Sequence, residues 1–181
     1  MDSIKLNDMK IDDIELREIS IYDVYDLYDI LTDDETLKYL TIPKFKSLID
    51  SKWVIENIYF KRLEENIPIG FAIVKDDTTI GIIDYHTKQG KFIELGYFLK
   101  SDYFGKGIMK KVLDKVIDYG FLKLGYLGYI IKTDTSNLRN LKLINHFHFK
   151  QFKEENNIKS FLLKKEDYYD NKTKRNIWCI T

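Results

Sequence analysis

The chain has 181 residues, of which 44% are hydrophobic and 32% charged, as is typical of one globular domain of ordinary size. Its 29 Lys and Arg equal its 29 Asp and Glu, so it has no overall positive field to hold a nucleic-acid backbone or an anionic membrane. The N-terminal segment shows no signal-peptide pattern, and no apolar run is long enough to span a bilayer. We therefore expect a cytoplasmic single domain over residues 1–181, without nucleic-acid or membrane partners.

Cysteine and histidine usage argues against a metal site. Cys179 is the only cysteine, which excludes an internal disulfide and a multi-cysteine zinc site. The three histidines have no close carboxylate spacing that would indicate a metal centre. We expect no metal, and we interpret Cys179 as a small hydrophobic residue in a terminal strand.

Hydrophobic periodicity predicts a strand, two helical regions, three strands, a helix, a strand, a helix and two strands. The expected strands cover residues 14–19, 69–74, 79–86, 92–99, 127–133, 161–163 and 177–180. Helices are expected after the capping pairs Ser20/Asp23 and Thr32/Glu35, over residues 47–65, from about 108 to 121, and after Asn137. The three central strands, separated by short polar clusters, predict an antiparallel meander.

The stretch YFGKGIM, residues 103–109, joins the strand at 92–99 to the helix that begins near Ile108. A strand that enters a glycine turn and then a helix directs backbone N–H groups and the positive end of the helix dipole at one point. Gly105 and Gly107 have no Cβ, so an anion such as a phosphate can approach the main chain, and Lys106 or Lys110 can add positive charge. Neither the P-loop nor the dinucleotide-binding pattern is present.

Two segments, IELGYFLKSDYFGKGIMKKVLDKVIDYGF and DTSNLRNLKLINHFHFK, resemble the acetyl-CoA signature of the GNAT N-acetyltransferases. Together with LTDDETLKYL they resemble the RimJ/RimL branch, which acetylates N-termini of ribosomal proteins. The resemblance extends from about residue 14 to residue 180. It implies an α+β fold (α/β mixed) with a central, mixed, mostly antiparallel sheet of six to seven strands. That sheet splays after its fourth strand and is flanked by about four helices.

The resemblance also implies where acetyl-CoA, the expected cosubstrate, would bind. Backbone groups of Phe98 and Leu99, freed from ladder pairing by the splay, would hydrogen-bond the pantetheine arm. The pyrophosphate would rest on the amides of the loop formed by Phe104, Gly105, Lys106, Gly107 and Ile108. Asn137 matches a cofactor-contacting position, although it could equally cap its helix. Asn140 could hydrogen-bond pantetheine or the thioester.

Transfer of an acetyl group to an amine needs a base and a proton for the leaving thiolate. Glu94, which matches the Glu of the ELGY motif, is the first candidate base, with a plain solvated strand residue as the alternative. Asp84 and His86 share a face of the preceding strand. Asp84 could lie opposite Glu94 and raise the pKa of one carboxylate, and His86 is a second candidate base.

The proton donor for the thiolate is less clear. Asn140 and Ile144 stand where related proteins often have Ser and Tyr, and neither side chain is an acid. Water, Tyr168, Tyr169 or the proton of the amine itself would then have to serve.

We expect an acetyl-CoA-dependent N-acetyltransferase that acts on a primary amine such as a peptide N-terminus. The alternatives are a transferase for a small amine (a polyamine, aminoglycoside or amino acid) and an acyl-CoA-binding sensor without turnover. The acidic run between Asp23 and Glu35 could attract a basic acceptor, or could be an ordinary solvated helix face. Monomeric and homodimeric states are both compatible with the resemblance.

Overall fold

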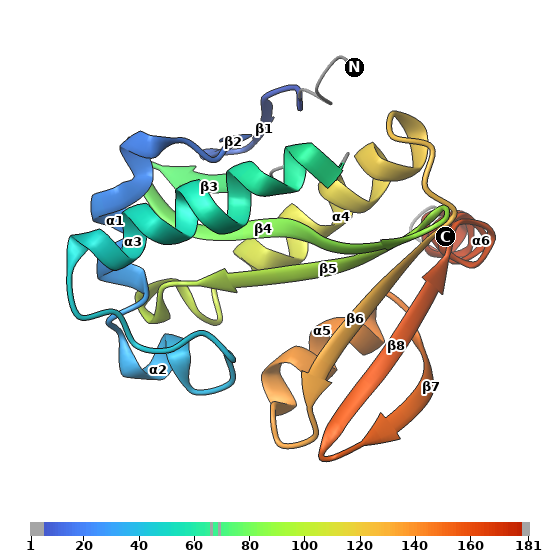
Figure 1. The fold of residues 1–181 in the computed structure, drawn as a ribbon. Helices are drawn as coiled ribbons and strands as arrows, with labels where there is room; N and C mark the ends of the chain where they lie inside the picture. The colour runs from blue at the N-terminus through green and yellow to red at the C-terminus, as the bar shows by residue number, and fades with distance from the viewer. Residues whose placement is uncertain (1–5, 66, 69, 179–181) are drawn as a thin grey trace. The chain divides into compact units, whose positions relative to one another are not determined.

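The computed structural model describes residues 6–65, 67–68 and 70–178. Within these residues eight strands form one sheet in the order β1-β2-β3-β4-β5-β6-β8-β7, and six α-helices accompany it (Figure 1). The sheet is mixed and mostly antiparallel, with β5 and β6 paired in parallel. This confirms the expected α+β class. The chain divides into two compact units, residues 1–87 with 96–115 and residues 88–95 with 116–181.

The first unit contains the N-terminal helices and most of the meander. Its strands are β1 (Met9–Ile11), β2 (Ile14–Glu18), β3 (Phe71–Lys75), β4 (Thr78–Gln89, up to residue 87) and β5 (Phe92–Leu99, from residue 96). Its helices are α1 (Val24–Ile30), α2 (Asp34–Leu37), α3 (Leu48–Val54) and the first half of α4 (Ile108–Leu122). A π turn (Ile55–Tyr59) and a 3₁₀ turn (Phe60–Glu65) follow α3, and short 3₁₀ turns span Ile21–Asp23 and Ser101–Tyr103.

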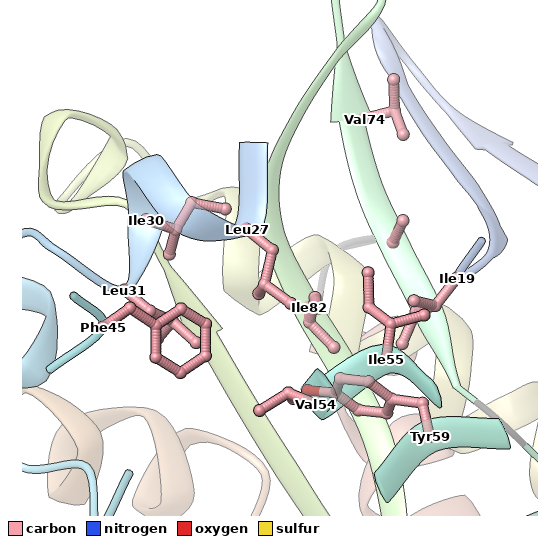
Figure 2. Close-up of a cluster of buried hydrophobic side chains, with 11 residues drawn as sticks. Ile19, Leu27, Ile30, Leu31, Phe45, Val54, Ile55, Tyr59, Val74 and Ile82 are labelled. Carbon is pink, nitrogen blue, oxygen red and sulfur yellow. The ribbon is translucent and has the colours of Figure 1, made fainter. Parts of the chain in front are cut away.

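One hydrophobic cluster of the first unit lies between α1, α3 with the π turn that follows it, and β3–β4 (Figure 2). Leu27 of α1 and Ile55 after α3 are fully buried, and they pack in one cluster with Ala72 of β3 and Ile82 of β4. Strand β3 is buried along nearly its whole length, so its sequence FAIVK is apolar on both faces instead of alternating. Burial of this apolar surface is the main force that holds the helices on the sheet.

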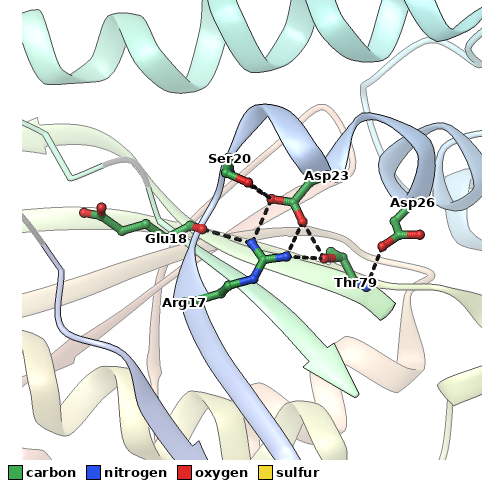
Figure 3. A network of polar contacts seen from close by, with 6 residues as sticks. All are labelled: Arg17, Glu18, Ser20, Asp23, Asp26 and Thr79. Carbon is green, nitrogen blue, oxygen red and sulfur yellow. Dashed lines mark hydrogen bonds and ion pairs between the residues drawn. The ribbon is translucent and has the colours of Figure 1, made fainter. Parts of the chain in front are cut away.

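A buried polar network joins β2, α1 and β4 (Figure 3). Both guanidinium Nη atoms of Arg17 donate to the carboxylate of Asp23, at 2.7 and 2.9 Å, and the Thr79 hydroxyl donates to the same carboxylate at 2.6 Å. The backbone N–H of Ser20 also donates to it, at 2.7 Å, which completes the predicted capping pair. Burial opposes ionisation of Asp23, but these donors outweigh it and lower its pKa.

The second unit pairs β6 (Gly128–Asp134), β8 (Ile158–Lys164) and β7 (Lys150–Glu155) antiparallel in that order, with α5 (Leu138–His146) beside β6. Helix α6 (Lys165–Trp178) follows β8 directly. The ring of Phe121, on α4, lies 4.9 Å from that of Tyr129 on β6 and 5.7 Å from that of Tyr168 on α6. These tilted aromatic pairs anchor both helices to the strands of this unit.

Most expected elements are present, and the differences have physical causes. The strand expected at 177–180 is wrong, because Ile177 and Trp178 belong to α6; residues 179–180, and therefore Cys179, lie outside the described residues. Strand β7 was not predicted, because its sequence KQFKEE is exposed throughout and carries no apolar alternation. The cap of α2 is Asp33 rather than Thr32, whose hydroxyl donates instead to the carbonyls of Tyr28 and Asp29.

No helix in the described ranges has both the length and the apolarity needed to cross a membrane.

The network around Asp23 should contribute strongly to stability. We expect Asp23→Asn to lower the free energy of unfolding by about 3 kcal/mol, because it leaves the Arg17 guanidinium without its partner. Since folding lowers the pKa of Asp23, its contribution is present above the ordinary pKa of aspartate and is lost as the pH falls through the lowered value. Denaturant unfolding at pH 7 and at pH 3 should therefore show a smaller difference from wild type at pH 3.

The exposed Asp76→Asn, in the β3–β4 turn, is the matched control and should change stability little. A loss in Asp23→Asn no larger than in this control would contradict the assignment.

Candidate active site

The glycine loop follows β5 and leads into α4, as predicted. Gly105 and Gly107 adopt left-handed φ values of +74° and +75°, and a Cβ at either position would meet nothing within 4 Å. The first backbone hydrogen bond of α4 runs from the Lys111 N–H to the Gly107 carbonyl (3.3 Å). The N–H of Ile108 lies before this bond and is one of the N-terminal N–H groups that have no acceptor within the helix. The Lys106 ammonium lies 5.1 Å from the ring centroid of Tyr103. The loop therefore presents main-chain donors, the helix dipole and a lysine in a place without steric obstruction.

The end of β5 is held more firmly than expected. The Leu99 carbonyl accepts a hydrogen bond from the Thr36 hydroxyl at 3.2 Å, so one of its two lone pairs is engaged. The Phe98 carbonyl approaches β4 so closely that a Cβ on Gly81 would lie 2.4 Å from it. The parallel ladder between β5 and β6 has three residue pairs and ends at Glu94–Ile130.

Asp84 of β4 is the centre of a buried charge cluster. Its Oδ2 accepts a short hydrogen bond from Arg62, whose side chain is only 12% exposed, and its Oδ1 lies 2.9 Å from His86 Nε2. The guanidinium carbon of Arg62 in turn lies 4.9 Å from the ring centroid of the buried Tyr59. His86, by contrast, is 43% exposed. The cluster thus connects the turns after α3 with a histidine that reaches solvent.

Two glycines, one on β5 and one just before β3, make room for this cluster. A Cβ on Gly96 of β5 would lie 1.9 Å from His86 Nε2 and 2.7 Å from Asp84 Oδ1. A Cβ on Gly70, before β3, would lie 2.6 Å from the Asp84 Cβ. No side chain larger than hydrogen fits at either position without displacing Asp84 or His86.

The charge state of Asp84 determines the direction of its bond to His86. Burial alone would raise the pKa of Asp84, but the hydrogen bonds and charges of His86 and Arg62 outweigh it and lower that pKa. The raised pKa expected for a carboxylate pair is therefore not found at Asp84. An ionised carboxylate only accepts hydrogen bonds, so His86 Nε2 carries the donated proton and Nδ1 is the atom with a lone pair when the ring is neutral.

Glu94, on β5, forms an ion pair with Lys132 of β6, with 2.8 Å between Oε2 and Nζ. Its side chain is 19% exposed, so it is not the plain solvated strand residue of the alternative interpretation. The β5 residue that lies against Asp84 is Gly96, two positions further along the strand than the predicted Glu94.

Asn137 caps α5, because its Oδ1 accepts a hydrogen bond from the Asn140 N–H at 3.1 Å. Ile144 is 1% exposed and belongs to the core. The Tyr169 hydroxyl donates to Asp118 at 3.0 Å, and the Tyr168 hydroxyl accepts from Lys172 at 3.1 Å. Both tyrosines thus have packing and hydrogen-bonding partners of their own on α4 and α6.

Sequence reasoning missed Arg62, Gly70 and Gly96 as part of the site. A usable signal existed in composition: the chain has only four arginines, and two of them, Arg17 and Arg62, each hold a buried aspartate. Arginine is preferred over lysine where a carboxylate must be paired inside a protein. Within the described residues, no three His, Cys, Asp or Glu side chains gather where they could bind a metal ion.

Known proteins with similar sequences are acetyltransferases. The chain is 28% identical to the uncharacterized N-acetyltransferase p20 of Bacillus licheniformis over 141 residues, which are 76% of this chain and 79% of that protein. It is 30% identical to the acetyltransferase PseH of Campylobacter jejuni over 100 residues, 54% of this chain and 60% of PseH.

Solved structures show the same fold. RimL, the ribosomal L7/L12 α-N-protein acetyltransferase solved with coenzyme A, matches with a TM-score of 0.78 at 14% identity, over 89% of this chain and 99% of that one. Mycobacterium smegmatis RimJ matches with a TM-score of 0.73 at 15% identity, over 85% of this chain and 83% of that one. The family model for the acetyltransferase (GNAT) domain matches residues 13–150, a range that includes parts of both compact units. The chain therefore belongs to the GNAT acetyltransferase family, and its structural neighbours are consistent with the RimJ/RimL branch.

Proposed function

We propose that this chain transfers the acetyl group of acetyl-CoA directly to a primary amine, as one catalytic domain over its whole length. The observation that carries the proposal is the unobstructed glycine loop between β5 and α4, in a chain that belongs to the GNAT family. In the reaction the amine nitrogen forms a bond to the acetyl carbonyl carbon and the carbon–sulfur bond breaks. The amine loses one proton to a base, the departing thiolate gains one from water, and the protonated base returns its proton to that water.

The loop Phe104–Gly105–Lys106–Gly107–Ile108 would hold the pyrophosphate of acetyl-CoA. Main-chain N–H groups at a helix N-terminus bind phosphate without a dedicated side chain, and Lys106 adds charge at the rim. Backbone groups of Phe98 and Leu99 are the proposed contacts for pantetheine. Asn137 would act mainly by fixing the start of α5.

His86 is the better supported proton acceptor, with Glu94 as the alternative. Asp84 uses both oxygens on Arg62 and His86 and stays ionised, so it would orient His86 instead of reacting itself. His86 Nδ1, which carries the lone pair of the neutral ring, would then accept the proton of the attacking amine. Glu94 Oε2 is engaged in the ion pair with Lys132, so Glu94 is the second choice.

The acceptor that we favour is a protein or peptide N-terminus. Support comes from the fold shared with RimL and with the ribosomal-protein-S5-alanine acetyltransferase of Vibrio fischeri (TM-score 0.73, 17% identity, over 90% of this chain and 98% of that one). A small amine is the alternative. The absence of Ser and Tyr at positions 140 and 144 keeps a sensor without turnover as a third possibility.

The experiment that tests the function is release of free CoA thiol from acetyl-CoA in the presence of N-terminal peptides, polyamines, aminoglycosides and amino acids. CoA binding is measured by calorimetry in the same preparations. Turnover on peptides supports the proposal, and turnover on small amines alone assigns the alternative acceptor. Binding without turnover on any acceptor indicates the sensor, and no binding contradicts the proposal as a whole.

Paired substitutions should identify the base. We expect His86→Gln, which can still donate to Asp84 but is not basic, to lower kcat by a factor of about 10² or more with little change in CoA affinity. Glu94→Gln should lower kcat less, and no more than Lys132→Met, which breaks the same ion pair and leaves the carboxylate. Steady-state kinetics over pH 6–9 measure these effects. A loss confined to Glu94→Gln would assign the base to Glu94.

A matched pair of glycine substitutions tests the loop. Gly107→Ala and Gly90→Ala each place a Cβ in open space on a left-handed backbone, at φ +75° and +62°. Both should therefore cost about 1 kcal/mol of stability. Gly107→Ala alone should weaken CoA binding, because a Cβ there would obstruct the phosphate. Equal CoA affinities in calorimetry for the two variants would argue against the loop as the phosphate site.

A further inference from the structure

Most acidic side chains between Asp23 and Glu35 bind other residues of the same chain, so they are not free to attract a basic acceptor. Five of its six acidic side chains have partners in the first unit: Asp23 with Arg17 and Thr79, Asp26 with the Thr79 N–H, Asp29 with Lys100, Asp33 with Ser101 and Thr36, and Asp34 with Lys44. Two of these aspartates bond to residues that directly follow β5. The run therefore points to a role at the entrance of the glycine loop.

We propose that Asp33 and Thr36, here called the α2 clamp, are positioning residues that hold the end of β5 and the start of the glycine loop in the shape that binds acetyl-CoA. This inference rests on the proposed function, because it assumes that the loop binds the cosubstrate. It assigns to α2 a part in cosubstrate affinity, although α2 is separated from the loop by more than sixty residues of sequence.

The Asp33 carboxylate joins two elements. Its Oδ1 accepts from the Glu35 N–H at 3.2 Å and thereby caps α2. Its Oδ2 accepts from the Ser101 N–H at 3.0 Å and from the Thr36 hydroxyl at 2.7 Å. The Ser101 N–H is the first donor of the 3₁₀ turn that leads to the loop, so no helical bond would satisfy it.

Thr36 reinforces the same connection from a buried position. Its hydroxyl, which has one proton, lies 2.7 Å from Asp33 Oδ2 and 3.2 Å from the Leu99 carbonyl oxygen. Lys100, which lies between Leu99 and Ser101, is held as well: its N–H donates to the Ile80 carbonyl at 2.8 Å, and its ammonium pairs with Asp29. Three consecutive residues, 99 to 101, are thus each tied to α1, α2 or β4.

The held segment continues directly into the loop. The Phe104 N–H donates to the Ser101 carbonyl at 2.9 Å, and Gly105 follows. A displacement of Ser101 therefore moves the first amides proposed to meet the pyrophosphate. Because ordering a flexible loop at the moment of binding weakens affinity, a loop that is fixed beforehand should bind acetyl-CoA more tightly.

The clamp should act at any physiological pH. Burial opposes ionisation of Asp33, but the bonds from Ser101 and Thr36 outweigh it and lower its pKa to about 2. A lowered pKa means that the carboxylate form persists above the ordinary value and is lost only as the pH falls toward 2. The effect of the clamp should accordingly be constant between pH 5 and pH 9.

The test compares Asp33→Asn with Asp34→Asn, its neighbour, whose exposed carboxylate forms an ion pair with Lys44. We expect Asp33→Asn to raise the Kd of CoA and the KM for acetyl-CoA about tenfold, since it removes a hydrogen bond to a charged group. The KM for the acceptor should stay the same, and Asp34→Asn should match wild type. Thr36→Val should behave like Asp33→Asn, and Thr36→Ser should restore tight binding.

Equal CoA affinity in wild type, Asp33→Asn and Thr36→Val would overturn the clamp, and so would an equal loss in Asp34→Asn. If Asp33→Asn fails to fold, the Thr36→Val and Thr36→Ser pair decides the question. If the wild-type chain itself binds no CoA, the proposed function fails separately. Hydrogen exchange of the amides of residues 101–108 then decides whether the clamp orders the loop: unchanged exchange in Thr36→Val overturns it.

Discussion

The bonds from aspartates of the first helical region to the sheet hold together the part of the chain that carries the glycine loop. Asp23 and Asp26 meet Thr79 at the start of β4, and Asp29 and Asp33 meet Lys100 and Ser101 after the end of β5. Asp26 and Asp29 lie on α1, Asp23 precedes that helix, and Asp33 lies after it as the N-cap of α2. Aspartates of α1 and of the two helix starts therefore hold both the helical region on the sheet and the path of the chain into the loop.

A buried carboxylate determines the proposed chemistry in a similar way. Asp84 is almost completely buried, yet Arg62 and His86 keep it ionised. Because an ionised carboxylate only accepts hydrogen bonds, it fixes the tautomer of His86. The cost of burying this charge is offset only while both partners remain, so Gly70 and Gly96 matter as much as the charged residues themselves.

Elements with a strong local pattern could be predicted from the sequence. The strand at 92–99, the glycine turn and the helix that begins at Ile108 appear as expected, because alternation, positive-φ glycines and helical periodicity are properties of neighbouring residues. Strand β7 could not be predicted, since pairing with β8 and not its own polar sequence makes it a strand. The same holds for α6, whose Tyr168 and Tyr169 pack against Phe121 of α4.

The sequence by itself determined the family, the loop and the residue types available for catalysis. The tertiary structure decided which of those residues meet: Asp84 with Arg62 and His86, Glu94 with Lys132, and Asp33 with Ser101. These partners lie up to 68 positions apart in the sequence, and the periodicity of neighbouring residues cannot predict contacts over such separations. The ionisation of a carboxylate depends on the donors around it, so its role becomes readable only when the fold has brought those donors together.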